Sequence, residues 1–409
     1  MFSFREIKHS FLVSLWFMFM TFPVLVIRVN TIENTIDWRW DRLVAVGIGS
    51  YVLTFVWRFL MHRKENRNDT YRVENNTVNP AVFIQKRFQE PRIYIPIYIG
   101  IAVFVIAFPF IFSMYQTNIM ITAFIYVVLG LGLNIVVGFA GLLNLGYVAF
   151  YAAGAYSYAL LNYHLGIGFW TALPISAGIG FLFGILLGFP VLRLRGDYLA
   201  IVTLAFGEIM RLVLENWNTF SFGPSGIANI PRPGFFGISL SLRQSTLYIY
   251  FLVVGLAVFT IFVVNRLKHS RIGRAWIALR EDEVACQAMG IDITKTKLAA
   301  FAIGATWAGM AGAFFAAKTT FINPASFTIW ESIIILCIVV LGGMGSIIGV
   351  IISALILILL PEYLRAFSQY RMLIFGTVLV VVMIFRPGGI IRLERKSYQF
   401  DGLNERIKK

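Results

Sequence analysis

Charged residues are scarce in this 409-residue chain, since Asp, Glu, Lys and Arg together make up only 13% of it. A soluble domain carries about 25%. Residues 93 to 192 contain none of the four, apolar residues reach 58%, and the mean hydropathy is +0.77. Apolar runs long enough to cross a bilayer, about 18 residues or more, recur along the whole length. The composition predicts an all-α polytopic membrane protein, because an outer-membrane barrel would show alternating segments of ~10 residues.

Residue types that carry chemistry are equally sparse. The chain has no Gly-x-x-x-x-Gly-Lys-Ser/Thr phosphate loop, which excludes ATP hydrolysis by that route. Its four histidines are scattered without metal-ligand or triad spacing. Its two cysteines, Cys286 and Cys337, are too few for a metal cluster. We therefore predict that the chain is not an enzyme, holds no metal and needs no cofactor.

The net charge of +15 would suggest nucleic acid in a soluble protein. Here Lys and Arg gather in loops and tails, which is typical of the positive-inside rule for membrane proteins, so we expect no nucleic-acid partner. The basic loops are 61–92, 193–195, 266–297 and the tail from residue 386. Placing them on one side predicts a multi-pass membrane protein with both termini in the cytoplasm.

The sharpest change in composition falls near residue 92. It predicts an N-terminal extension over 1–92 with two spanning helices and a basic linker, a core over 93–392, and a basic tail over 393–409. In total we expect about 10–11 spanning helices with Gly-rich broken or re-entrant segments. Ten apolar spans are 11–28, 43–60, 93–113, 119–138, 145–163, 169–192, 198–216, 246–265, 298–318 and 372–386, and two further pieces, 329–341 and 346–360, are short. If residues 329–360 form two separate elements rather than one continuous helix, the basic tail lies in the cytoplasm with the other basic loops.

Glycine and asparagine are concentrated in GLNIVVGFAGLLNLGYVAFYAAGAY, residues 132–156. Gly130, Asn134, Gly138 and Gly141 share one helical face, where small residues allow two backbones to approach closely. Clustered glycines between apolar runs also indicate a broken helix whose free backbone groups line a polar path. The candidate positions can serve either close contact between helices or the lining of a transport path, and both interpretations stay open. These are Asn134, Gly138, Gly141, Asn144, Gly146, Gly342, Gly343 and Gly345.

Three charges lie inside an apolar segment: Glu208, Arg211 and Glu215 follow one helical face at i, i+3 and i+7. Ionisable groups at membrane depth are costly and usually face protein or water. They either line the path of a zwitterionic solute or form a structural ion pair in which the charges compensate each other. Lys318 and Glu331 fall near the ends of spans, where we expect them to extend towards the membrane surface.

The long basic loop contains GRAWIALREDEVACQAMGID, residues 273–292. Acidic residues at its centre and Gly290 beyond predict a short helix on the cytoplasmic side. Its apolar residues fall on one face. Such a helix either lies on the membrane surface or docks in a groove of a partner protein. The candidate coupling residues are Arg280, Glu281, Asp282, Glu283, Val284, Ala285, Ala288, Met289 and Gly290.

These stretches together resemble the M-type permease of the branched-chain amino acid importer, an ATP-binding-cassette system. The resemblance runs from about residue 93 to 392, and seven motifs occur in family order. They are residues 132–156 and 273–292 above, LRLRGDYLAIVTLAFGEI (192–209), GPSGI (223–227), AGMAGAFFAA (308–317), VVLGGMGS (339–346) and FRPGGI (385–390).

The resemblance implies a transport subunit that moves leucine, isoleucine and valine inward by alternating access. It implies four kinds of neighbour: a homologous second permease subunit, two ATP-binding subunits that engage the 275–292 segment, an extracytoplasmic substrate-binding protein, and membrane lipid. Two alternatives stay open. One is a urea or short-amide permease of the same superfamily, and the other is an ion-coupled secondary transporter, which would need more intramembrane charges than are present.

Overall fold

The computed structural model describes residues 91–191, 194, 196–234 and 241–367, with scattered positions between 14 and 54 and between 373 and 391. The chain divides into two compact units, Met1–Ile99 and Gly100–Lys409. The first contains an antiparallel hairpin of β1 (Ile27–Asn30) and β2 (Thr35–Trp38), which the sequence did not predict. The predicted extension 1–92, the tail 393–409 and the last span 372–386 lie largely outside the described residues, so their boundaries stay predictions.

Helices make up the rest of the described chain, which confirms the all-α polytopic prediction. They are α4 (Pro91–Ile111), α5 (Met114–Leu133), the π-helix η1 (Asn134–Phe139), α6 (Tyr147–Leu165), α7 (Phe169–Val191), α8 (Asp197–Asn216), α9 (Asn218–Ser221), η2 (Gly223–Ser225), α10 (Leu242–His269), α11 (Arg271–Glu281), α12 (Glu283–Ala288), α13 (Ile293–Thr319), η3 (Pro324–Ser326), α14 (Ile329–Gly342), α15 (Ile347–Tyr363) and η4 (Leu364–Phe367).

Five helical segments of the described part are long and apolar enough to cross a membrane: Met114–Phe139, Phe169–Val191, Leu242–His269, Ile293–Thr319 and Pro324–Gly342. Two shorter apolar helices, Gly100–Ile111 and Ile347–Tyr363, accompany them. The total of 10–11 spans stays a prediction.

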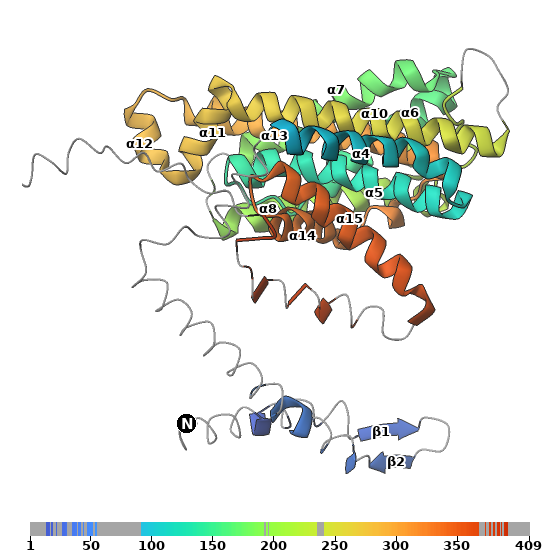
Figure 1. Cartoon of the computed structure of the whole chain (residues 1–409), viewed down its shortest axis with the longest axis vertical. Coiled ribbons are helices and arrows are strands. Elements are labelled where there is room, and N and C mark those ends of the chain that lie inside the picture. Colours follow the sequence, from blue (N-terminus) through green and yellow to red (C-terminus); the bar gives the residue numbers. More distant parts are fainter. Residues whose placement is uncertain are drawn as a thin grey trace, which may run out of the picture. The chain divides into compact units, whose positions relative to one another are not determined.

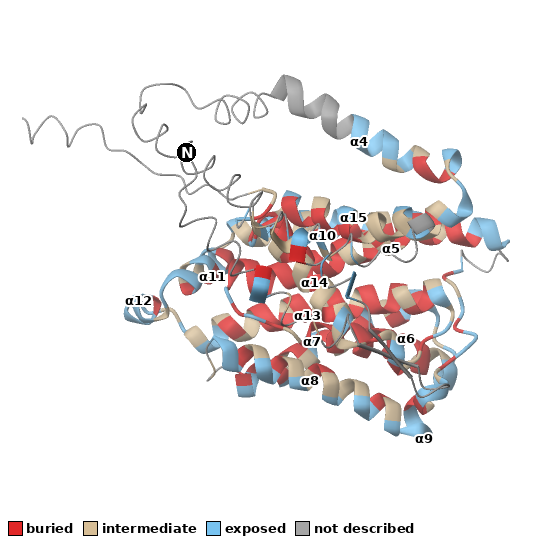
Figure 2. Cartoon of the chain, turned by 90° about the horizontal axis from the view of Figure 1, so that it is seen from below, coloured by how far each residue is buried: buried red, intermediate tan, exposed pale blue. Residues whose placement is uncertain are grey.

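Helix α13 lies at the centre of the second unit and packs against α5, α6 and α7 (Figures 1 and 2). Glycine makes these contacts possible. A Cβ atom on Gly154 of α6 would lie 2.1 Å from the Gly309 carbonyl oxygen of α13, and one on Gly180 of α7 would lie 2.5 Å from the Ala305 carbonyl oxygen. Small residues therefore let the backbones of α6, α13 and α7 approach closely, at positions other than those singled out in the sequence.

Helices α14 and α15 are separate and pack on each other, with Gly342 against Gly349. The chain turns between them at Gly343 and Gly345, whose φ angles of 100° and 87° suit glycine alone. The structure thus has two elements over 329–360, as the distribution of charge indicated. The 14 residues of α14 cover about 21 Å, and only together with η3 do they form the 19-residue candidate span Pro324–Gly342.

The two ends of the second unit differ. Helices α11 and α12 project from one end of the bundle, whereas α9 lies at the opposite end (Figure 2). Helix α5 begins at the α9 end and reaches, through η1, the end that carries α11. The connection between α13 and α14 lies on the α9 side and is hydrogen-bonded to the loop after η2, through Ile227 with Ile322 and Ile230 with Thr320.

Candidate functional site

Helix α12 forms where the acidic cluster predicted it. Asp282 is its N-cap, and the carboxylate accepts hydrogen bonds from the backbone N–H groups of Val284 (2.8 Å) and Ala285 (3.0 Å). Gly290 ends the segment with a φ of 81°. A second helix, α11, precedes α12, and the sequence did not predict it. The pair forms a helical hairpin that extends from the bundle.

The apolar face of α12 points away from the rest of the chain. Val284 is 68% exposed and Met289 is 82% exposed, while Ala285 and Ala288 are exposed beside them. Cys286 is the buried residue of this helix and faces the chain's own core. An exposed apolar face on a helix that projects from the bundle suits a groove in a partner or a membrane surface, so the geometry fits both interpretations.

Two contacts fasten the hairpin to the start of α13. Glu283 forms an ion pair with Lys297 at 2.6 Å, and the Lys297 side chain is only 4% exposed. Trp276 of α11 is fully buried and donates from Nε1 to the Thr296 carbonyl oxygen at 2.8 Å. Asp292 caps α13, and its hydrogen bond from the Lys295 backbone lowers the pKa of the carboxyl. A displacement of α12 therefore acts directly on α13.

A third contact joins the hairpin to the first Gly-rich break. The Arg280 guanidinium, at the end of α11, donates from Nη1 to the Gly138 carbonyl oxygen at 2.6 Å. Gly138 belongs to η1, where the chain leaves the α-helical hydrogen-bond pattern. Gly141 has a φ of 72°, and a Cβ atom there would lie 2.7 Å from Arg280 Cγ. A glycine is thus required where Arg280 crosses the break.

The two Gly-rich breaks contact each other through Asn134. Its side chain is fully buried, and Oδ1 accepts a hydrogen bond from the Gly345 N–H at 2.8 Å. A Cβ atom on Gly138 would lie 1.9 Å from this oxygen and 2.6 Å from the Gly345 nitrogen. Asn134 Nδ2 is buried and has no hydrogen-bond partner among the described residues. Segments 211 residues apart in sequence thereby form one polar junction inside the bundle.

Asn144 and Gly146 have a different, local role. Asn144 Oδ1 accepts a hydrogen bond from the Gly146 N–H at 3.0 Å, which closes the turn before α6. Gly146 abuts α8, where a Cβ atom would lie 1.9 Å from the Thr203 carbonyl oxygen. The neighbouring Leu145 N–H is bound by Thr203 Oγ1 at 3.1 Å. At this turn the amide and the glycine serve the contact between α6 and α8.

Glu208, Arg211 and Glu215 form an ion-paired row on α8. Arg211 contacts Glu208 at 2.5 Å and Glu215 at 2.6 Å. Both contacts lie within one helix, and the three side chains are partly exposed. The pair is therefore self-satisfied and does not anchor α8 to another described helix of this chain.

The side chains of Lys318 and Glu331 both contact α5, which the sequence did not predict. The Lys318 ammonium donates to Thr122 Oγ1, and the Tyr126 hydroxyl donates to the Glu331 carboxylate. The reason is that α13 ends and α14 begins beside the middle of α5, which the lengths of the helices do not reveal in the sequence. No pattern in the sequence links these four residues.

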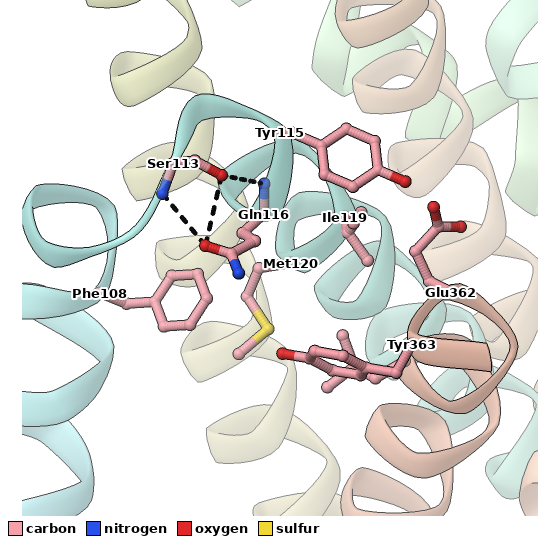
Figure 3. Close-up of a pocket in the computed structure, with 9 residues that line it drawn as sticks. Phe108, Ser113, Tyr115, Gln116, Ile119, Met120, Glu362 and Tyr363 are labelled. Carbon is pink, nitrogen blue, oxygen red and sulfur yellow. Dashed lines mark hydrogen bonds between the residues drawn. The ribbon is translucent and has the colours of Figure 1, made fainter. Parts of the chain in front are cut away.

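A pocket lies at the α9 end of the bundle, between α4, α5 and α15 (Figure 3). Its polar rim includes the capping box of α5, in which Ser113 and Gln116 exchange hydrogen bonds. Glu362 beside it pairs with Arg365. None of the residues singled out in the sequence lines this pocket. The described residues also contain no group of three or more His, Cys, Asp or Glu that could hold a metal ion.

A helical bundle that crosses the membrane, breaks its helices at buried glycines and extends a hairpin beyond one end has the architecture of a membrane permease. Residues 115–384 match the model of the branched-chain amino acid transport system permease component, and the chain belongs to this family. It is a transport subunit and not an enzyme, and it is a multi-pass protein of the inner membrane.

The chain is 46% identical over 316 residues to the high-affinity branched-chain amino acid transport system permease protein LivM of Salmonella typhimurium, covering 72% of this chain and 74% of that protein. Its identity to LivM of Escherichia coli is also 46%, over 73% of this chain and 75% of the relative. LivH of Escherichia coli, a second permease protein, is 26% identical over 65% of this chain and 91% of its own length. No solved structure matches the chain. Similarity to both permeases indicates a multi-component system with a second, homologous permease subunit.

Proposed function

We propose that the chain is the membrane-spanning subunit of an ATP-driven importer that moves leucine, isoleucine and valine into the cell by alternating access. The similarity to LivM over most of the chain supports the substrate class. A second permease subunit completes the membrane part, two ATP-binding subunits dock from the cytoplasm, and an extracytoplasmic binding protein delivers the solute. Membrane lipid covers the remaining apolar surface.

The observation that carries the proposal is the series of hydrogen bonds that connects the α11–α12 hairpin with the two Gly-rich breaks. Helix α12 presents Val284 and Met289 outward, as a segment that docks in an ATPase groove must. Arg280 connects the hairpin with the first break through a hydrogen bond to the Gly138 carbonyl oxygen. Asn134 connects that break with the second one through a hydrogen bond from the Gly345 N–H. A π-helix such as η1 often marks a functional site or a hinge.

In this mechanism ATP-driven closure of the two ATPases displaces α11 and α12. The displacement reaches α13 through the ion pair of Glu283 with Lys297, and η1 through Arg280. Because the breaks at Asn134–Phe139 and 343–346 meet at one polar junction, they move together and open or close the cytoplasmic end of the path. The chain itself forms and breaks no covalent bond, and both termini lie in the cytoplasm.

The proposal is tested by uptake in cells that lack only this gene. We expect the deletion to abolish high-affinity uptake of radiolabelled leucine, isoleucine and valine, and plasmid-borne wild type to restore it, with urea uptake unchanged as the control. Loss of urea uptake with normal leucine uptake would instead support the short-amide permease. Leucine uptake that persists when the ATPases are inactivated would contradict the ATP-driven mechanism.

A further inference from the structure

Four polar side chains from three helices meet beside the middle of α5. Thr122 and Tyr126 belong to α5, Lys318 to the last turn of α13, and Glu331 to the first turn of α14. The ammonium group of Lys318 is bound to the Thr122 hydroxyl, and the carboxylate of Glu331 accepts from the Tyr126 hydroxyl. All four residues are partly exposed rather than fully buried.

The α5 side of this cluster lies near the middle of a candidate membrane span, whereas Lys318 lies one residue from the end of the span Ile293–Thr319. Tyr126 is at the midpoint of the 26-residue span Met114–Phe139. At 1.5 Å per residue the midpoint is about 20 Å from either end of the span. Many transporters place the substrate site near this depth, where helices are interrupted. Here the connection between α13 and α14 begins after Thr319, contains η3 and lies on the α9 side of the cluster.

The two charges are opposite but do not pair with each other. Among the described residues, no ion pair joins Lys318 to Glu331, and each is held by a neutral hydroxyl instead. Thr122 and Tyr126 are four residues apart on α5, so they lie on the same face of this helix, about one turn apart. Ionisable groups at this depth are expensive and usually have a functional reason. An ammonium and a carboxylate that do not pair with each other can both bind a ligand that carries the two opposite charges.

An apolar wall borders the charged pair. Tyr151 of α6 packs against Phe315 and Phe327, with ring centroids 5.4 Å apart in each case. Phe315 precedes Lys318 by one helical turn on α13. The Val148 N–H of the same helix donates to Oγ of Ser332, the residue after Glu331, at 3.0 Å. The wall and the charges thus adjoin one another, which is the usual design of a pocket for an apolar solute with a polar end.

We propose that Thr122, Tyr126, Lys318 and Glu331 bind the translocated solute as a zwitterionic α-amino acid. Glu331 accepts its ammonium group and Lys318 binds its carboxylate, while Tyr151, Phe315 and Phe327 surround the aliphatic side chain. One α-amino acid carries both charged groups on a single carbon, so it offers a partner to each of the two side chains. The inference rests on the proposed function and deepens it, because it names the residues that contact the amino acid.

The first experiment uses the complete importer, reconstituted in vesicles with its ATPases, second permease and binding protein. In Lys318→Met and in Glu331→Gln one charge of the amino acid loses its partner, so leucine uptake falls by about tenfold or more. Tyr126→Phe removes one hydroxyl and lowers uptake by about three- to tenfold. The matched controls are Arg365→Met and Glu362→Gln, a charged pair outside the cluster. They leave uptake unchanged.

Assembly of the complex and ATP hydrolysis stimulated by the binding protein are measured in the same preparations. A role in binding the solute predicts normal assembly and hydrolysis with little uptake. Uptake at the wild-type rate in both charge variants overturns the inference while leaving the proposed function intact. If the wild-type importer moves no leucine, the proposed function fails and the inference fails with it.

A second experiment needs no variant and holds even if the substitutions prevent assembly. The wild-type importer is irradiated during turnover with photo-leucine, a leucine with a diazirine in its side chain, and the labelled residues are mapped by mass spectrometry. We expect labels on Tyr151, Phe315 or Phe327, with excess leucine suppressing them. Labels confined to other segments, with uptake intact, overturn the inference.

Discussion

The Arg280 guanidinium lies 2.6 Å from the Gly138 carbonyl oxygen and joins the end of the projecting hairpin to the first broken helix of the bundle. The carbonyl is available because η1 departs from the α-helical pattern at this point. A charged donor on a backbone carbonyl is a strong contact and is sensitive to position. In the proposed mechanism this pair carries movement of α12 to the first broken helix.

We predict that Arg280→Gln uncouples transport from ATP hydrolysis. A hydrogen bond with a charged partner contributes about 1.5–3 kcal/mol, so its loss lowers uptake per ATP hydrolysed by about tenfold or more. Arg274→Gln is the matched control, since Arg274 on the same helix contacts only the nearby His269 carbonyl oxygen among the described residues. Uptake and ATPase rates in reconstituted vesicles give the ratio. Equal ratios in the two variants would exclude the role assigned to Arg280.

The ion pair of Glu283 with Lys297 leads to a prediction about stability. Glu283→Lys places a second positive charge against a buried ammonium, and breaking such a pair costs about 3–5 kcal/mol. We expect the single variant to lower the thermal midpoint of the purified complex and to abolish uptake. Lys297→Glu combined with Glu283→Lys restores the opposite charges and recovers part of both losses. A double variant no better than Glu283→Lys alone would show that the pair does not transmit movement.

The exposed apolar face of α12 predicts a docking defect that leaves the fold intact. Met289→Asp puts a charge on a side chain that is 82% exposed, so the chain accumulates normally in the membrane. A charge buried in an apolar groove is costly, and we expect the ATPases to dissociate from the complex on purification. Gln287→Asp, on the exposed surface of the same helix, serves as the control. Retention of the ATPases by Met289→Asp would favour the membrane-surface interpretation of α12.

Hydropathy and glycine spacing predicted most of the helices of the core, because a spanning helix needs a long apolar run and little else. The turn at Gly343 and Gly345 was predicted too, since glycine there is a local requirement of the backbone. What the sequence could not predict were contacts between distant segments. Asn134 meets Gly345, and Lys318 and Glu331 meet α5, only because α14 is short and begins inside the bundle. The depth of a helix start depends on packing, which residue spacing does not encode.

The glycine contacts predict a clear difference between two alanine substitutions. A Cβ atom on Gly154 would lie 2.1 Å from the Gly309 carbonyl oxygen, whereas nothing lies within 4 Å of one on Gly178. Gly154→Ala forces α6 and α13 apart and destabilises the protein by about 1–3 kcal/mol or more. Gly178→Ala is neutral or slightly stabilising because alanine favours the helix. Thermal unfolding of the two purified variants measures the difference. Similar midpoints would contradict the close-packing role of Gly154.

Variants of the charged row on α8 distinguish a structural role of these residues from a role in transport. Arg211 pairs with Glu208 and Glu215 within one helix, so Arg211→Gln leaves two carboxylates without a cation in an apolar setting. Ionised side chains there cost about 2.5–3.5 kcal/mol each by insertion scales, and we expect the single variant to accumulate poorly. Glu208→Gln with Arg211→Gln removes one carboxylate as well and regains part of the lost protein. Immunoblots of membranes measure abundance, and leucine uptake is normalised to it. If Arg211→Gln and Glu208→Gln each accumulate normally as single variants but lose uptake, the row lies on the transport path instead.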